Sequence, residues 1–196
     1  MADDSTSQPR LSRASPLRTQ VQERLQAERL RAQQVALVEL AKSETLHGGE
    51  LAEAFRAITE IAARTISVGR ASVWLFDEDH SAIRLMDLYD VEQARHSAGT
   101  VLFERNYPAY FQALETEEQA IAAHDAHTDP RTREYSESYL TPLGIGAMLD
   151  VPIRLKGRGA GVFCYEHVGG PRTWAPEEQS FAGSMATMVT LALDAY

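Results

Sequence analysis

Two stretches of alternating sequence constrain the fold of this 196-residue chain more than any other feature. In residues Ala71–Asp79 the side chains alternate with a period of two and many are β-forming types. A second such stretch, Ala82–Asp90, follows after a short polar turn. The arrangement recurs at Gly146–Leu155 and Ala160–Val168, joined by a turn at Lys156–Gly159. A period of two interrupted by a turn is typical of a β-hairpin. The sequence therefore predicts two hairpins in one mostly antiparallel sheet of five or six strands.

Helix-forming sequence lies on both sides of these hairpins. Leu17–Lys42 contain strong helix formers without glycine or proline, while Leu51–Thr65 and the segment from Pro176 onward each gather apolar residues on one side. We expect a disordered tail at residues 1–16, an N-terminal helix at 17–42 that serves in dimerisation, and a domain at 43–196. The predicted class is α+β, with the N- and C-terminal helices on one face of the sheet.

The segment between the hairpins, which we call the insert, is the least regular part of the chain. We expect it to cover the other face of the sheet. It predicts a helix at Tyr107–Gln119, a strand at Ala120–His124 and a helix at Arg131–Leu140. Pro142 and Gly144 are expected to end that second helix. Short helices and loops over a sheet leave a concave, partly apolar space, which is the usual setting for a small ligand.

Composition excludes several classes of function. The formal net charge is −9, and an acidic chain is poorly suited to the phosphate backbone, so no nucleic-acid partner is expected. The sequence has no long apolar run and no apolar core of a signal peptide, so neither membrane insertion nor secretion is expected. Cys164 is the single cysteine and has no disulfide partner within the chain. These features favour a cytoplasmic location.

Three motifs resemble the GAF family. ASVWLFDEDHSAIRLMDLYD resembles the opening hairpin of GAF domains, and PLGIGAMLDVPIRLKGRGAGVFCYEHVG resembles their closing hairpin. TWAPEEQSFAGSMATMVTLAL resembles their terminal helix. The likeness runs from about Leu40 to Tyr196 and is nearest to bacterial GAF domains that precede histidine kinases or diguanylate cyclases, where HDAHTDPRT and EHVGGPR-x-W stretches recur. The resemblance implies a sensor domain, but the family binds many ligands or none.

Departures from the motifs of GAF subfamilies narrow the range of ligands that the resemblance allows. A covalent bilin implies a cysteine in the insert, whereas Cys164 lies in the closing strand. The sulfoxide reductases of this family work through several cysteines, and this chain has one. The N-K-x-F-x-D-E pattern of cyclic-nucleotide binders is missing. The cofactor, if there is one, therefore stays unknown at this point.

A short loop in the insert carries four potential ligand-binding side chains: His124, Asp125, His127 and Asp129. One interpretation makes them ligand contacts or metal ligands, with Glu166 or His167 of the last strand as a third donor. The favoured alternative is loop structure, in which the aspartates accept backbone N–H groups. No metal site is predicted, because histidines spaced by three in a loop are a weak signal.

Asp150 lies inside an apolar predicted strand, so it should be exposed at an edge, paired, or functional. The favoured interpretation is pairing across the hairpin, also near Glu166, and the minority interpretation is a ligand anchor. Strand alternation places Cys164 and Glu166 on one face of the sheet, and Tyr165 and His167 on the other. The arginines available to pair with Asp150 are Arg131, Arg133, Arg154 and Arg172.

Aromatic residues gather on the two predicted insert helices, where they pack the insert on the sheet or line an aromatic pocket. Catalytic and P-loop motifs such as G-x-S-x-G, H-E-x-x-H and G-x-x-x-x-G-K are missing, so no enzyme activity is predicted. The candidate ligand-binding residues are Tyr110, His124, Asp125, Asp129, Tyr135, Tyr139, Met148, Asp150, Cys164 and Glu166.

These features lead to one functional hypothesis and one alternative. The hypothesis is a sensory module that binds a small ligand between sheet and insert, and signals through its terminal helices in a homodimer. Its output would reach an effector domain or a partner such as a histidine kinase, in two-component or cyclic-di-nucleotide signalling. The alternative is a dimerisation or protein-interaction module that binds no ligand.

Overall fold

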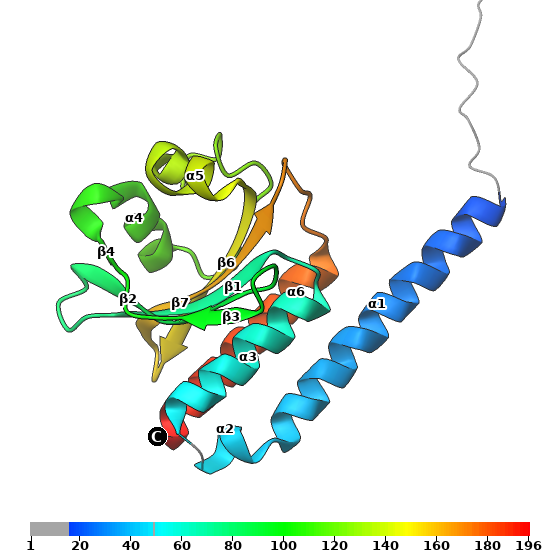
Figure 1. Cartoon of the computed structure of the whole chain (residues 1–196), viewed down its shortest axis with the longest axis horizontal. Coiled ribbons are helices and arrows are strands. Elements are labelled where there is room, and N and C mark those ends of the chain that lie inside the picture. Colours follow the sequence, from blue (N-terminus) through cyan, green and yellow to red (C-terminus); the bar gives the residue numbers. More distant parts are fainter. Residues whose placement is uncertain (1–15, 49) are drawn as a thin grey trace, which may run out of the picture.

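A computed structural model describes residues 16–48 and 50–196, and Figure 1 shows its arrangement. The predicted tail at 1–16 lies outside the described residues except for Pro16, which begins the first helix. In chain order the elements are α1 (Pro16–Lys42), α2 (Glu44–Gly48), α3 (Leu51–Thr65), β1 (Arg70–Phe76), β2 (Ala82–Asp90), β3 (Arg95–Ser97), β4 (Val101–Phe103), η1 (Glu104–Asn106), α4 (Pro108–Thr116), β5 (Ile121–Ala123), η2 (Arg133–Tyr135), η3 (Ser136–Leu140), α5 (Thr141–Leu143), β6 (Ile145–Leu155), β7 (Arg158–Val168) and α6 (Pro176–Ala195).

The strands form one antiparallel sheet in the order β3-β2-β1-β7-β6-β5, with β4 pairing beside β3 on β2. This confirms the α+β class and both predicted hairpins. The described residues contain seven strands rather than five or six, because β3 and β4 are edge segments of only three residues each. Such short strands carry too little alternation to be predicted. Among the described residues, no helix is long and apolar enough to cross a membrane.

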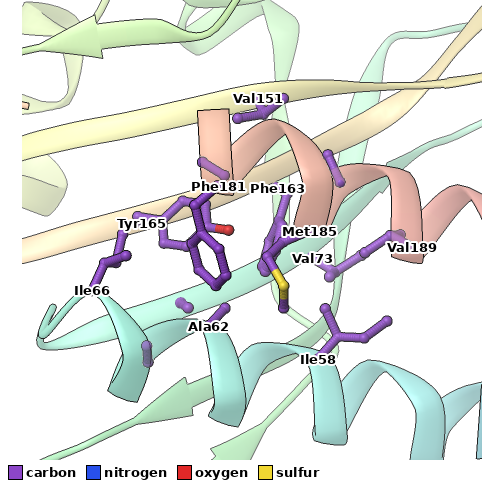
Figure 2. Close-up of a cluster of buried hydrophobic side chains, with 14 of the residues drawn as sticks. Ile58, Ala62, Ile66, Val73, Val151, Phe163, Tyr165, Phe181, Met185 and Val189 are labelled. Carbon is purple, nitrogen blue, oxygen red and sulfur yellow. The ribbon is translucent and has the colours of Figure 1, made fainter. Parts of the chain in front are cut away.

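Helices α3 and α6 lie side by side across one face of the sheet (Figure 1). Their apolar sides pack on the inward residues of β1, β6 and β7, and Figure 2 shows this core. The residues labelled there are Ile58, Ala62, Ile66, Val73, Val151, Phe163, Tyr165, Phe181, Met185 and Val189. Because strand side chains alternate, this packing assigns the neighbouring residues of the same strands to the opposite face.

Helix α1 contacts α3 and α6 only through its C-terminal part, where Gln33, Ala36 and Leu40 are buried. Residues 17–32 are all exposed, and this half of the helix projects away from the domain (Figure 1). Its apolar residues have no partner within the described chain: Leu17 is 70% exposed and Val21 is 51% exposed.

The insert over the second face departs from the prediction at one place. Residues 131–140 were expected to form an ordinary helix, but the chain makes a 3₁₀ turn at η2, a π turn at η3 and a last α-helical turn at α5. In the π turn the Thr141 N–H bonds to the Ser136 carbonyl, and Pro142 then enters the first turn of α5, where its missing N–H is tolerated. Pro142 therefore does not end the helical run. Gly144 does, with a left-handed φ of 65°.

Candidate functional site

The site begins with two neighbouring rungs of the β6–β7 hairpin. Met148 pairs with Glu166, and Asp150 pairs with Cys164. Alternation directs these four side chains toward the insert, whereas Phe163 and Tyr165 of β7 face α3 and α6. The predicted division of β7 into two faces is therefore confirmed for Cys164, Tyr165 and Glu166. Both carboxylic acids are buried on interior strands of the sheet: Asp150 on β6 is 0% exposed, and Glu166 on β7 is 2% exposed.

Two tyrosine hydroxyls connect the insert to these carboxylates. Tyr110 of α4 donates a hydrogen bond of 2.8 Å to Oδ2 of Asp150, and its oxygen lies 3.6 Å from Sγ of Cys164. Tyr139 of η3 donates a hydrogen bond of 2.7 Å to Oε1 of Glu166. Hydrogen bonds to a charged acceptor are the stronger class of such bonds, and here they fix the insert to the sheet at two points.

Tyr135 lies between the other two tyrosines. Its ring meets Tyr110 edge-on with centroids 5.0 Å apart, and its centroid is 5.9 Å from that of Tyr139. Its other face stacks on Tyr107 at 4.1 Å. Offset and edge-on contacts of this kind are favourable, so the three tyrosines form one packed aromatic wall. The hydroxyl of Tyr135 is buried and has no hydrogen-bond partner in the described chain.

The wall encloses a cavity of about 10 Å³, which is room for a single water molecule. Six of the predicted ligand-binding residues line it, and Asp150 lies behind Tyr110 and Cys164. Trp74, Ile83 and Leu102 were not predicted as site residues. Alternation in the first hairpin does not say which face of its strands meets the insert, and Leu102 lies on the short strand β4 outside that hairpin. The lining residues are Trp74, Ile83, Leu102, Tyr110, Tyr135, Tyr139, Met148, Cys164 and Glu166.

Burial controls the ionisation of the site. It raises the pKa of Asp150 to about 7, against the lowering effect of the hydrogen bond from Tyr110. Burial also raises the pKa of Glu166, and there the charge of Arg70 and the hydrogen bond from Tyr139 act in the opposite direction. The pKa values of the Cys164 thiol and of the Tyr135 hydroxyl are raised well above their ordinary values, again mainly by burial. The thiol and the phenol are therefore neutral at physiological pH.

The favoured interpretation of Asp150 was wrong. Within residues 16–48 and 50–196, Asp150 makes no ion pair with any arginine, and its Oδ1 has no hydrogen-bond partner. Three of the four candidate arginines contact other groups: Arg131 binds Asp129, Arg154 binds the Glu117 carbonyl, and Arg172 binds Glu178. The paired acid is Glu166, whose Oε2 lies 3.3 Å from Nε of Arg70.

The loop with the two histidines lies outside the cavity lining, so the structure does not bring His124, Asp125 and Asp129 together with the six lining residues. Nδ1 of His124 accepts the backbone N–H of Trp174, and Oδ1 of Asp125 accepts that of His127. Asp129 accepts both the backbone N–H and the guanidinium of Arg131, which lowers the pKa of this carboxyl. These contacts match the structural interpretation of the loop.

His127 contacts neighbouring elements through both of its ring nitrogens. Its Nδ1 lies 2.6 Å from Oγ of Ser136, and its Nε2 lies 3.0 Å from the carbonyl oxygen of Ile145. Both ring nitrogens are thus occupied by contacts that hold the loop to η3 and β6. Among the described residues, no group of three or more histidine, cysteine or acidic side chains could hold a metal ion.

Comparison with known proteins identifies the family. The GAF domain family model matches residues 50–193. The chain belongs to the GAF family. Members of this family are generally sensory or regulatory rather than catalytic. None of the curated proteins compared with this chain matches it.

Solved structures share the GAF fold at low sequence identity. The GAF domain of an Acinetobacter phosphoenolpyruvate-protein phosphotransferase has a TM-score of 0.64 and 17% identity, over 87% of this chain and 94% of that one. The chromophore-binding domain of a Stigmatella aurantiaca bacteriophytochrome has a TM-score of 0.63 and 16% identity, over 86% of this chain and 60% of that one. A cyanobacteriochrome GAF domain has a TM-score of 0.61 and 18% identity, over 78% of this chain and 94% of that one.

Proposed function

We propose that this GAF domain is a sensory module that binds a small ligand in the cavity between its sheet and its insert. The observation that carries the proposal is the distribution of unpartnered polar atoms. Six buried side-chain nitrogen or oxygen atoms of the described residues have no hydrogen-bond partner, and five of them belong to Arg70, Tyr135, Asp150 and Glu166. Two of these five, Nε of Arg70 and Oε2 of Glu166, face each other in an ion pair, which leaves Nη1 of Arg70, the Tyr135 hydroxyl and Oδ1 of Asp150. Leaving such atoms unpaired is costly, so their concentration around one cavity favours a group that binds there.

The β6–β7 hairpin provides a route from the cavity to the terminal helices. Cys164 and Glu166 face the cavity, while Phe163 and Tyr165 of the same strand pack in the core against α3 and α6. A ligand that moves the insert-facing side chains would therefore change the packing beneath α6. Close-packed cores respond to such changes by shifting whole elements, and a helix shift of this kind is a common signalling transition.

We further propose that the terminal helices pair with those of a second copy. Leu17, Val21 and Leu25 lie four residues apart and form one exposed apolar stripe, 70%, 51% and 48% exposed. A helix of this kind gains most of its stability from packing, so an unpartnered stripe favours a partner helix. The output would pass through these helices to an effector domain or to a partner protein such as a histidine kinase.

The proposed setting is the cytoplasm, in two-component or cyclic-di-nucleotide signalling, with no catalytic activity of its own. A lone free thiol, Cys164, suits a reducing compartment. The fold neighbours support a regulatory role, since they include a GAF domain from a phosphotransferase and chromophore-binding domains of photoreceptors. A tetrapyrrole is not proposed here, because the cavity has room for about one water molecule and the only cysteine is buried.

Ligand-dependent melting tests the proposal. A panel of nucleotides, small aromatics, amines and organic acids should contain at least one compound that raises the melting temperature, because a ligand at about 100 times its Kd stabilises by about 2.7 kcal/mol. Tyr135→Phe removes an unpartnered cavity hydroxyl and should reduce that shift. Tyr196→Phe changes the same chemical group where it is 85% exposed, and should leave the shift unchanged. A shift that both variants retain would place binding elsewhere and contradict the proposed site.

One observation favours a second function, a dimerisation module without a ligand. The protein's own side chains nearly fill the space between the sheet and the insert, and the cavity that remains is about 10 Å³. Absorbance and native mass spectrometry of the purified protein, together with the melting panel, decide between the two. A protein that carries no small molecule and responds to none, but forms dimers, would support the second function.

A further inference from the structure

The charges around the cavity do not balance. Two buried carboxyl groups, Asp150 and Glu166, lie on adjacent rungs of the β6–β7 hairpin. Within the described chain one cation pairs with them: Arg70, whose Nε is 3.3 Å from Oε2 of Glu166. Asp150 accepts a hydrogen bond from Tyr110 but has no ion-pair partner within the described chain. The charge of Arg131 is the smallest of the causes that act on the pKa of Asp150, and Arg131 is itself paired with Asp129. When Asp150 is ionised, the site therefore carries a negative charge that no paired cation compensates.

This negative charge acts inside the cavity. After burial, the charge of Asp150 is the next cause that raises the pKa of the Cys164 thiol, and the charge of Glu166 acts in the same direction. The charge of Asp150 also raises the pKa of the Tyr135 hydroxyl. Cys164 and Tyr135 both line the cavity, so a negative charge is disfavoured at its wall. The same potential favours a positive charge there.

The cavity wall also provides the contacts that a cation uses. Trp74, Tyr110, Tyr135 and Tyr139 contribute aromatic side chains to the lining, and an aromatic face attracts a cation. The hydroxyl of Tyr135 has no hydrogen-bond partner, and Oε2 of Glu166 has no hydrogen bond beside its ion pair with Nε of Arg70 at 3.3 Å; both side chains are at least nine-tenths buried. Each can accept a hydrogen bond from an N–H group.

We propose that the cavity takes a small molecule with a protonated nitrogen, such as an amidinium or a primary ammonium, and discriminates against carboxylates. This proposal rests on the proposed sensory function and specifies its ligand class. A molecule larger than water enters by displacing Leu102 or Tyr139, the two least buried residues of the lining. Tyr139 lies on the π turn η3, and its movement would break its hydrogen bond to Glu166 and loosen the insert.

Three probes of nearly identical shape test the charge directly: acetamidinium, acetamide and acetate. Each is titrated into the full-length protein at one ionic strength and at one pH above the pKa of Asp150, which is about 7, so that this carboxyl group is ionised. The melting temperature and the chemical shifts of the cavity residues are the readouts. Acetamidinium should bind, and acetamide and acetate should bind at least about tenfold more weakly. Asp150→Asn should weaken acetamidinium binding by roughly tenfold and leave acetamide binding unchanged. Glu137→Gln removes an exposed acid on the insert and should change neither.

The outcomes separate this inference from the proposed function. Acetate or acetamide binding more tightly than acetamidinium, with cavity residues responding, would overturn the ligand class and leave the sensory function standing. Acetamidinium binding that Asp150→Asn does not weaken would overturn the role of the uncompensated charge. Failure of all three probes overturns the ligand class, and the broader panel of compounds then decides whether the cavity binds any ligand. Because Asp150→Asn changes a buried group, the variant must first be shown to fold. The melting temperature of the ligand-free variant provides that check.

Discussion

Tyr110 donates a hydrogen bond of 2.8 Å to Asp150 and so joins α4 of the insert to the central strand β6. Both groups are buried, and this bond is the only one the structure gives to Oδ2 of Asp150 from an oxygen or nitrogen donor within the described chain. Tyr110→Phe would leave the carboxylate with fewer donors. We expect it to lower the free energy of unfolding by about 1–3 kcal/mol, measured by urea denaturation.

Tyr196→Phe is the matched control for this variant, because it removes the same hydroxyl at a position 85% exposed. It should change the free energy of unfolding by less than about 0.5 kcal/mol. Equal effects of the two variants would show that the bond between Tyr110 and Asp150 contributes nothing to holding the insert.

The buried acid also predicts how stability depends on pH. The pKa of Asp150 is about 7 in the folded protein, above its ordinary value of 3.8. Between these values the folded state holds a proton that the unfolded state has released, so the free energy of unfolding decreases as pH rises. The stabilisation is complete below about pH 4 and is lost by about pH 7, with an upper bound on the order of 4 kcal/mol.

Urea denaturation at pH 5, 6, 7 and 8 measures this slope. Asp150→Asn should flatten it between pH 5 and 7, because the amide does not titrate. Glu166 has a raised pKa for the same reason of burial, so part of the slope should persist in the variant. A wild-type protein whose stability rises from pH 5 to pH 7 would contradict a buried, uncompensated Asp150.

Local pattern explains why so much of the fold was predictable. Helix α3 begins and ends at the predicted residues, Leu51 and Thr65, because its apolar side and its flanking sequence are both readable along the chain. The hairpins follow from alternation in the same way. The π turn at Ser136–Leu140 could not be predicted, since its hydrogen-bond pattern depends on how the insert packs on the sheet.

The candidate site was likewise predictable only where a local sequence pattern places its residues. Alternation was enough to place Cys164 and Glu166 on one face. Tyr135 and Tyr139 both pack the insert on the sheet and line the cavity, so the two interpretations of the aromatic residues hold together. The pairing of Arg70 with Glu166 joins residues that are far apart in sequence and meet only through the register of β1 against β7. No spacing along the chain signals such a contact, so the predicted pairing of Asp150 with one of four arginines was wrong and the pair of Arg70 with Glu166 was missed.

Two glycine positions should respond to alanine in opposite ways. A Cβ at Gly161 of β7 would lie 2.0 Å from the carbonyl oxygen of Trp74, a backbone atom of the neighbouring strand. Gly161→Ala should therefore force β1 and β7 apart and lower the free energy of unfolding by more than about 2 kcal/mol. A Cβ at Gly183, inside α6, meets no atom within 4 Å. Gly183→Ala should raise it by about 0.5–1 kcal/mol through helix propensity.

Urea denaturation of both variants beside the wild type measures these changes, with circular dichroism to confirm that each variant is folded. If Gly161→Ala were as stable as the wild type, the close approach of β1 and β7 would be wrong. A loss of stability in Gly183→Ala would mean that this face of α6 is covered in solution, which a second copy of the chain could do.

The exposed half of α1 provides the test of dimerisation. Removing residues 1–31 deletes the stripe of Leu17, Val21 and Leu25 but keeps the buried Gln33, Ala36 and Leu40, so the domain core should stay folded. We expect the full chain to be a dimer and the shortened chain a monomer, by light scattering coupled to size exclusion.

In the full chain, Val21→Glu with Leu25→Glu should raise the dimer dissociation constant by at least about tenfold, because each places a charge in an apolar helix contact. Thr19→Glu with Gln26→Glu adds the same charges on the opposite side of the helix, where they should have little effect. A full chain that is monomeric at all concentrations, or a shortened chain that remains dimeric, would contradict pairing through α1.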